Sequence, residues 1–164
     1  MKVLNASEKE WDDWKWQLSN RITDVHTLAK ILNLSDEEIH QIDMIGKKFR
    51  WAISPYYASL MDPDDPFCPV RRQAVPSIEE MDEAGEEDPM AEEFTSPVEG
   101  ITRRYPDRLI VKVTNQCAMY CRHCQRRRCI GQKDLALPMA ALRKCVEYIR
   151  NEEEIRDVLI TGGD

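Results

Sequence analysis

The sequence lacks an apolar run of the roughly eighteen residues that a membrane-spanning helix needs. Charged side chains interrupt its first positions, so it also lacks the apolar core of a secretory signal peptide. Histidine is scarce, at 3 residues, and neither His26 nor His40 has a second metal-type residue four positions later. We therefore expect no membrane partner and a cytoplasmic location, and we interpret both histidines as surface or packing residues.

The charge of the chain is unevenly distributed. The net charge is -7, yet residues 79–93 carry nine Asp or Glu and no base, whereas residues 103–133 carry nine Lys or Arg. The acidic run is typical of a solvated, mobile loop. The basic block lacks the aromatic side chains and the fold signature of a nucleic-acid-binding module, so we expect no nucleic-acid partner and favour small anionic ligands.

Three of the 6 cysteines lie close together, with the spacing Cys117-x3-Cys121-x2-Cys124. Three thiolates on one loop suit an iron-sulfur cluster of four irons that keeps one iron open, whereas a structural zinc site normally has four protein ligands. Zinc with His123 or Cys129 as fourth ligand, and a disulfide with a spare thiol, are the alternatives. The clustering of cysteines in a chain without a signal peptide favours metal binding over disulfides.

The cysteine motif lies between two predicted strands. An apolar run from Leu109 to Thr114 precedes it, and a second run, Val158 to Thr161, follows about thirty residues later. Pro138 is suited to the first turn of a helix that extends to about Asn151. Strand, cysteine loop, helix and strand make one β/α/β unit, and its class is α/β.

The part before this unit is predicted to be helical. A capping box at residues 7–10 begins a first helix that runs through residues 11–18, a second helix covers residues 25–32, and Ser35 caps a third that ends at Ser54-Pro55. Prolines at positions 63, 66 and 69 predict an extended course. We place a domain boundary near residue 100, between a helical region with its linkers (1–100) and a second domain (101–164).

Two motifs resemble a known family. The cysteine loop after a strand, with His123 directly before Cys124 and with Gly162-Gly163-Asp164 after the second strand, is similar to the radical S-adenosylmethionine enzymes. The runs 104–108 (Arg-Tyr-Pro-Asp-Arg) and 117–128 (Cys-Ala-Met-Tyr-Cys-Arg-His-Cys-Gln-Arg-Arg-Arg) resemble the lysine 2,3-aminomutase family, which includes glutamate 2,3-aminomutases. The resemblance implies the first β/α/β unit of an incomplete radical-SAM (β/α) partial barrel.

The resemblance implies three cofactors and their sites. A 4Fe-4S cluster would be held by the three clustered cysteines. S-adenosyl-L-methionine would be bound by His123 at its adenine and by the 162–164 turn at its methionine end. Pyridoxal 5'-phosphate would be held by Arg104, Tyr105 and Arg108, with its anchoring lysine outside this chain. Arg126 would bind the substrate carboxylate, and Arg127 and Arg128 are left as structural ion-pairing residues.

The implied activity is the transfer of an amino group between C2 and C3 of a free amino acid, glutamate or lysine. The implied partners are an electron donor such as a flavodoxin or ferredoxin and further copies of the chain in a homo-oligomer. We expect an amino-terminal fragment that is inactive by itself. Two other functions remain open: a zinc- or cluster-binding interaction module without catalysis, and a related radical-SAM enzyme that acts on a protein-bound lysine.

Overall fold

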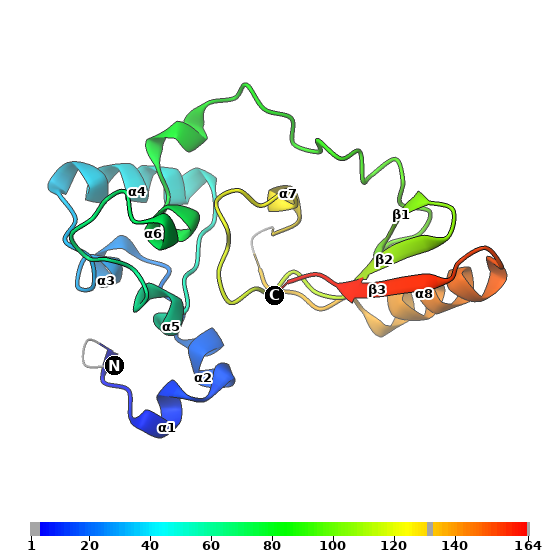
Figure 1. Cartoon of the computed structure of the whole chain (residues 1–164), viewed down its shortest axis with the longest axis horizontal. Helices are drawn as coiled ribbons and strands as arrows, with labels where there is room; N and C mark the ends of the chain where they lie inside the picture. The colour runs from blue at the N-terminus through cyan, green and yellow to red at the C-terminus, as the bar shows by residue number, and fades with distance from the viewer. Residues whose placement is uncertain (1–3, 131–132, 164) are drawn as a thin grey trace. The chain divides into compact units, whose positions relative to one another are not determined.

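The computed structural model describes residues 4–130 and 133–163 (Figure 1). The chain divides into two compact units. The helical unit contains Met1–Gly85 and Cys117–Cys124, and the sheet unit contains Glu86–Gln116 and Gln125–Asp164. The cysteine loop thus belongs to the helical unit although it lies far along the sequence. The predicted domain boundary near residue 100 stays a prediction.

Short helices make up the helical unit. They are α1 (Glu8–Trp11), α2 (Trp14–Ser19), α3 (Val25–Leu28), α4 (Asp36–Lys48), α5 (Pro55–Ala58), α6 (Pro69–Ala74) and the 3-10 helix η2 (Ile78–Met81). Within the described residues, no helix is both long enough and apolar enough to cross a membrane.

The capping boxes are confirmed, but the first predicted helix is broken. Ser7 and Glu10 form a reciprocal capping box that begins only the single turn of α1. The side chain of Asp13 then accepts a hydrogen bond from the Lys15 amide at 2.9 Å and starts α2 as a new helix. An Asp in this position competes with the backbone and divides the helix in two. The second predicted helix is also shorter, because α3 covers only Val25–Leu28.

The predicted end of the third helix at Ser54-Pro55 is wrong. Ser35 caps α4 with Glu38 as expected, but the helix ends at Lys48 because Phe49 has an extended backbone. Ser54 and Pro55 instead start α5, where Pro occupies a position whose N–H needs no helical partner. Pro69 starts α6 in the same way, so the predicted extended course is wrong from that residue onward.

One apolar cluster forms the core of the helical unit. Its buried members come from α3, α4, α5, α6 and the segments that precede, connect and follow these helices: Ile22, Val25, Leu28, Leu32, Ile42, Trp51, Ile53, Ala58, Met61, Ala74 and Val75. Met119, from the cysteine loop, packs against this cluster. The loop therefore shares the core of the helical unit.

The sheet unit contains the predicted β/α/β unit. Its elements are β1 (Ile101–Tyr105), β2 (Arg108–Lys112), α7 (Arg127–Ile130), α8 (Met139–Asn151) and β3 (Asp157–Thr161). The strand order is β1-β2-β3, and β2 pairs with β3 in parallel, as a β/α/β unit requires. The mixed α/β class is thereby confirmed. Strand β1 was not predicted, because its Thr-Arg-Arg centre lacks an apolar run; it pairs antiparallel with β2.

Helix α8 packs against one face of the sheet (Figure 1). Buried Ile101, Leu109, Val111 and Cys145 form the centre of this core, with Leu142 and Ile149 of α8 partly buried beside them. Cys145 is only 1% exposed and belongs to this apolar core. Strand β3 lies at an edge of the sheet, and its Leu159 and Ile160 are 61% and 69% exposed.

Strands β2 and β3 differ in burial. Truncating a leucine side chain should therefore lower the free energy of unfolding more on β2 than on β3. Leu109→Ala on β2 should lower the free energy of unfolding by about 2–5 kcal/mol, because it leaves a cavity under α8. Leu159→Ala on β3 is the matched control and should change the free energy by less than about 0.5 kcal/mol. Urea denaturation of both variants measures the difference, and equal costs would contradict the assigned core.

Candidate functional site

The cysteine loop, residues 117–124, is attached to the helical unit by backbone hydrogen bonds. The Tyr120 amide donates to the Ala52 carbonyl at 3.0 Å, and the Arg122 amide donates to the Gln73 carbonyl at 2.8 Å. Ile53 forms antiparallel bridges with Ile22 on one side and Met119 on the other. The loop thus continues a small ladder of extended segments, which restricts its backbone.

The side chain of Tyr120 fastens the centre of the loop. It is 1% exposed, and the guanidinium carbons of Arg50 and Arg21 lie 4.9 and 5.5 Å from the centroid of its ring. Arg21 Nη1 also donates to the Tyr120 hydroxyl at 3.3 Å and to the Cys117 carbonyl at 2.6 Å. A buried ring that contacts two cations gains from both contacts. Arg21 lies outside both motifs, and the 117–128 motif assigns no role to Tyr120, so their contact could not be predicted from the sequence.

A second attachment lies between the last two cysteines. Arg122 donates from Nε and Nη2 to the carboxylate of Glu80 at 2.9 and 2.6 Å, and the two side chains are only 7% and 10% exposed. A two-point contact of this kind fixes direction as well as distance. Glu80 belongs to the acidic run, whose prediction as a solvated loop is wrong at this residue.

The predicted cluster ligands lie on this anchored loop. Cys117, Cys121 and Cys124 are partly exposed, and a turn brings the Cys124 amide to 3.1 Å from the Cys121 carbonyl. His123 is exposed. None of the 6 cysteines, all of them in the described part of the chain, forms a disulfide. Within residues 4–130 and 133–163, no three His, Cys, Asp or Glu side chains are arranged to hold a metal ion.

The donor set itself fits an iron-sulfur cluster. It consists of three soft thiol donors within eight residues, held on a fixed backbone and reachable from solvent. Cys129, the candidate fourth zinc ligand, is exposed on α7 and belongs to the sheet unit rather than the helical unit. The ligand assignment stays a prediction.

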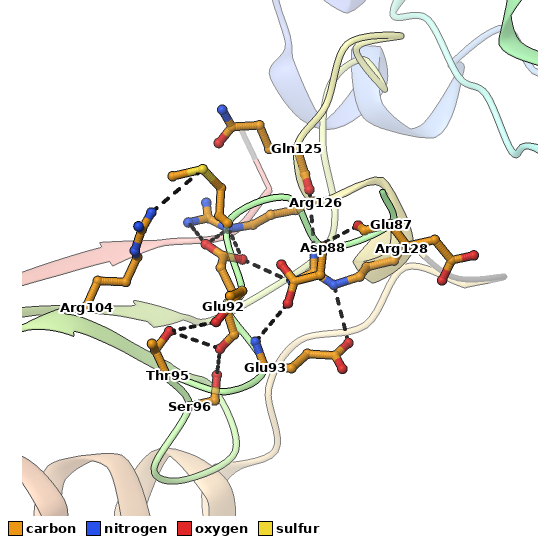
Figure 2. A network of polar contacts seen from close by, with 12 residues as sticks. Glu87, Asp88, Glu92, Glu93, Thr95, Ser96, Arg104, Gln125, Arg126 and Arg128 are labelled. Carbon is orange, nitrogen blue, oxygen red and sulfur yellow. Dashed lines mark hydrogen bonds and ion pairs between the residues drawn. The ribbon is translucent and has the colours of Figure 1, made fainter. Parts of the chain in front are cut away.

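Arg126, the predicted substrate-binding residue, lies in the sheet unit and contacts a carboxylate of the acidic run (Figure 2). Its Nε donates to both carboxylate oxygens of Glu92 at 3.1 Å, and its Nη2 donates to Oε1 at 2.8 Å. The Glu92 side chain is 8% exposed, whereas that of Arg126 is 31% exposed. Glu92 therefore holds one edge of a guanidinium group that still reaches solvent.

Arg128 joins the same network (Figure 2). Its Nη2 lies 2.8 Å from Asp88 and 3.5 Å from Glu92, and its Nε lies 3.4 Å from Glu93. The interpretation of Arg128 as an ion-pairing residue is confirmed. Part of the acidic run thus balances the charges of Arg126 and Arg128. Its prediction as a solvated loop is also wrong at Asp88 and Glu92.

The environment of Glu92 favours its ionised form. Burial acts to raise its pKa, but the hydrogen bond and charge of Arg126, with the charges of Lys112 and Arg128, outweigh burial and lower the pKa below its ordinary value of 4.5. The carboxylate is therefore charged at neutral pH, where it pairs with both arginines.

The paired glycines after β3 lie against the segment that follows β2. Gly162 has φ +150°, a conformation that L side chains rarely adopt, and a Cβ there would collide with the Thr114 carbonyl. The Gly163 amide donates to that same carbonyl at 2.8 Å, and a Cβ on Gly163 would collide with the Gln116 carbonyl. Close approach of two backbones thus requires glycine at both positions. Asp164 lies outside the described residues.

The predicted phosphate-binding residues lie on the β1–β2 hairpin. Arg104, Tyr105 and Arg108 are all exposed, and the Arg108 guanidinium carbon lies 4.8 Å from the Tyr105 ring centroid. Arg104 Nη1 lies 3.7 Å from the sulfur of Met90. Arg103 instead pairs with side chains of the same unit: its Nη1 donates to the Tyr148 hydroxyl at 2.8 Å and to the Glu152 carboxylate at 2.5 Å. The hairpin thus presents two arginines and one tyrosine to solvent.

Comparison with curated proteins gives closely similar relatives. The chain is 57% identical, over 100% of its own length, to the glutamate 2,3-aminomutase of Clostridioides difficile. It is 48% and 49% identical, over 98% of its length, to the L-lysine 2,3-aminomutases of Clostridium subterminale and Bacillus subtilis. The chain belongs to the 2,3-aminomutase family. The family resemblance predicted from the two motifs is thereby confirmed.

The chain spans only 34% to 39% of the length of these relatives. No protein-family model matches it. The match therefore supports family membership over the whole chain. The roles of individual residues stay predictions.

The Glu92 pair predicts an acid-dependent loss of stability. Because the folded-state pKa is lowered, the stabilisation is present above the unfolded-state value near 4.5 and is lost as the pH falls through the folded-state pKa. Glu92→Gln should lower the free energy of unfolding by roughly 2 kcal/mol at neutral pH and remove this part of the pH dependence. Urea denaturation from about pH 7 to about pH 3 measures both effects.

Glu93→Gln is the matched control, because the neighbouring side chain is 75% exposed and lies 3.4 Å from Arg128. It should leave the pH profile of wild type nearly unchanged. A Glu92→Gln profile that also follows wild type would mean that the pair does not contribute to stability.

Proposed function

We propose that this chain provides the cluster-binding and substrate-carboxylate-binding part of a radical-SAM, pyridoxal-phosphate-dependent 2,3-aminomutase that acts on free glutamate. The main support for this proposal is the 57% identity, over the entire chain, to a glutamate 2,3-aminomutase. Identity to the two lysine 2,3-aminomutases compared above is 48% and 49%, so glutamate is favoured over lysine.

The proposed cluster ligands are Cys117, Cys121 and Cys124. When bound, the 4Fe-4S cluster and S-adenosyl-L-methionine would together supply a carbon radical that removes a substrate hydrogen, and pyridoxal 5'-phosphate would carry the migrating amino group. The thiolates of the chain would hold three irons and leave the fourth for the methionine end of the nucleotide. Support comes from the anchored backbone of the loop and its all-thiol donor set.

The nucleotide would be oriented by residues at the two ends of the crossover. The exposed imidazole of His123, directly before Cys124, is suited to contact the adenine. By the resemblance to the family, Gly162 and Gly163, which Asp164 follows in the sequence, would contact the methionine amino group. Support comes from the close approach of both glycines to the backbone of residues 114–116, the segment that directly precedes Cys117.

Arg126 is the proposed ligand of the substrate carboxylate. Its guanidinium is planar and can form two parallel hydrogen bonds to a carboxylate. Glu92 contacts the edge formed by Nε and Nη2, which fixes the plane of the group before substrate arrives. A plane fixed in advance reduces the entropy lost on binding.

The exposed β1–β2 hairpin is the proposed contact of the pyridoxal phosphate. Arg104 and Arg108 supply cationic donors for a phosphate, and Tyr105 supplies a hydroxyl donor. All three side chains are exposed, so they are accessible to a ligand of this size.

The parallel β2–α8–β3 arrangement suits the first unit of a (β/α) partial barrel. Further strands would pair with the edge of β3 and cover the exposed Leu159 and Ile160. We propose that the active enzyme is a longer, cytoplasmic homo-oligomer that receives electrons from a flavodoxin or ferredoxin. The anchoring lysine would lie outside this chain, so the chain alone should not turn over.

A chimera tests the proposed function. This chain replaces the matching 39% of the Clostridioides difficile glutamate 2,3-aminomutase, and the chimera is assayed with glutamate, both organic cofactors and a chemical reductant. Release of β-glutamate is expected, because the grafted chain supplies the proposed cluster ligands and Arg126. The 164-residue chain by itself should release none.

A Cys121→Ala chimera is the negative control, and a Cys129→Ala chimera is its matched partner. The first should be inactive and the second active. A folded, iron-loaded chimera that releases no β-amino acid from glutamate or lysine would overturn the proposal.

Iron content of the chain itself tests the ligand set. After anaerobic reconstitution with iron and sulfide, Cys121→Ala should lose most of the bound iron, because one of three thiolates is removed. Cys129→Ala should retain it, because that exposed thiol is not a proposed ligand. Iron and sulfide analysis with electron paramagnetic resonance measures both variants.

Equal loss of iron in the two variants would move Cys129 into the ligand set. Zinc at one ion per chain without sulfide would instead favour the interaction-module alternative.

A further inference from the structure

Arg21 connects the amino-terminal helices to the first cysteine of the loop. It follows the end of α2, where its Nε donates to the Leu18 carbonyl at 3.1 Å. Its Nη1 donates to the Cys117 carbonyl at 2.6 Å and to the Tyr120 hydroxyl at 3.3 Å. One side chain thus joins two segments that are 96 residues apart in sequence.

The contact with the Cys117 carbonyl restricts the backbone from which the first thiol extends. The carbonyl orientation sets ψ of Cys117, and a donor at 2.6 Å holds the peptide plane that follows it. The next residues of the loop are held by the buried ring of Tyr120 and by the Met119 bridge to Ile53. The backbone that carries the first thiol is therefore fixed through one arginine.

The position of Arg21 is itself fixed. The residue that follows it, Ile22, exchanges two backbone hydrogen bonds with Ile53, at 2.7 and 3.0 Å. Ile22 and Ile53 are 2% and 0% exposed. The guanidinium thus extends from a rigid, buried ladder and not from a freely moving helix end.

We infer that Arg21 is a positioning residue for the cluster: through the Cys117 carbonyl and Tyr120 it holds the first thiolate in place, so that the helical unit acts as the scaffold of the cluster loop. The inference rests on the proposed function in one respect, that the loop binds iron. Mutation of a group that orients a metal ligand from outside the coordination sphere commonly lowers metal affinity tenfold or more.

The test measures iron transfer from the reconstituted 164-residue chain to an iron chelator under anaerobic conditions. Arg21→Ala should lose iron roughly tenfold faster than wild type. Tyr120→Phe keeps the ring that contacts both guanidinium groups but removes one acceptor, so its rate of iron loss should rise only about twofold. Arg21→Lys keeps the charge without the fork and should not restore the wild-type rate.

Arg71→Ala is the matched control. Arg71 forms a partly buried ion pair with Glu38 at 2.5 Å in the same unit, and this pair involves no residue of the cysteine loop. Its loss should destabilise the helical unit without changing the rate of iron transfer. Circular dichroism at the assay temperature verifies that each variant is folded, and Arg21→Lys decides the question if Arg21→Ala does not fold.

Three results separate the inference from the proposed function. Iron bound by wild type and lost at the same rate from folded Arg21→Ala or Arg21→Lys overturns the inference alone. Equal acceleration in Arg71→Ala also overturns it, because the effect would then be general destabilisation. A wild-type chain that binds no iron overturns both.

Discussion

The structure depends on the pairing of arginines near the cysteine motif with carboxylates of the acidic run. In the helical unit Arg122 pairs with Glu80, and in the sheet unit Arg126 and Arg128 pair with Glu92 and Asp88. The uneven distribution of charge along the sequence is thereby explained within each unit. Two runs of opposite sign, each unfavourable by itself, become counter-charges once the chain folds.

Such pairs add little net stability compared with an apolar pair of the same size, although removal of one partner is costly, and they fix the orientation of both side chains. Burial of two charges is costly, and only close, two-point hydrogen bonding offsets the cost. Arg122 and Arg126 both meet this condition, with two donor atoms each on one carboxylate. The same arginines adjoin the cysteines in sequence, so orientation is gained where the proposed chemistry needs it.

Local signals in the sequence predicted part of this fold. Both capping boxes, the crossover helix and the parallel strands follow from side-chain patterns within a few residues, and the structure confirms them. Family membership followed from the two motifs around the cysteines. The breaks in the helices were harder, because Asp13 and Pro55 can either end one helix or begin the next.

The rest depends on contacts between residues far apart in sequence. Nothing near Glu80 or Glu92 shows that an arginine more than thirty positions later will cover it, so the acidic run was interpreted as solvated. Arg21 lies outside the motifs and is 99 residues from Tyr120 in sequence, so their contact becomes visible only in three dimensions. Strand β1 was missed for a related reason, since its pairing with β2 compensates for its polar composition.

The acidic run also has an unequal tolerance to change along its length. Glu80 and Glu92 are fixed by their arginines, yet a methyl group added to Gly85 between them would meet no atom within 4 Å. Insertions and deletions around Gly85 would therefore cost little, whereas one residue gained or lost between Arg122 and Arg126 would displace a thiol or a guanidinium. Insertions and deletions in related chains should accordingly concentrate around Gly85, between the two paired carboxylates, and spare residues 122–126.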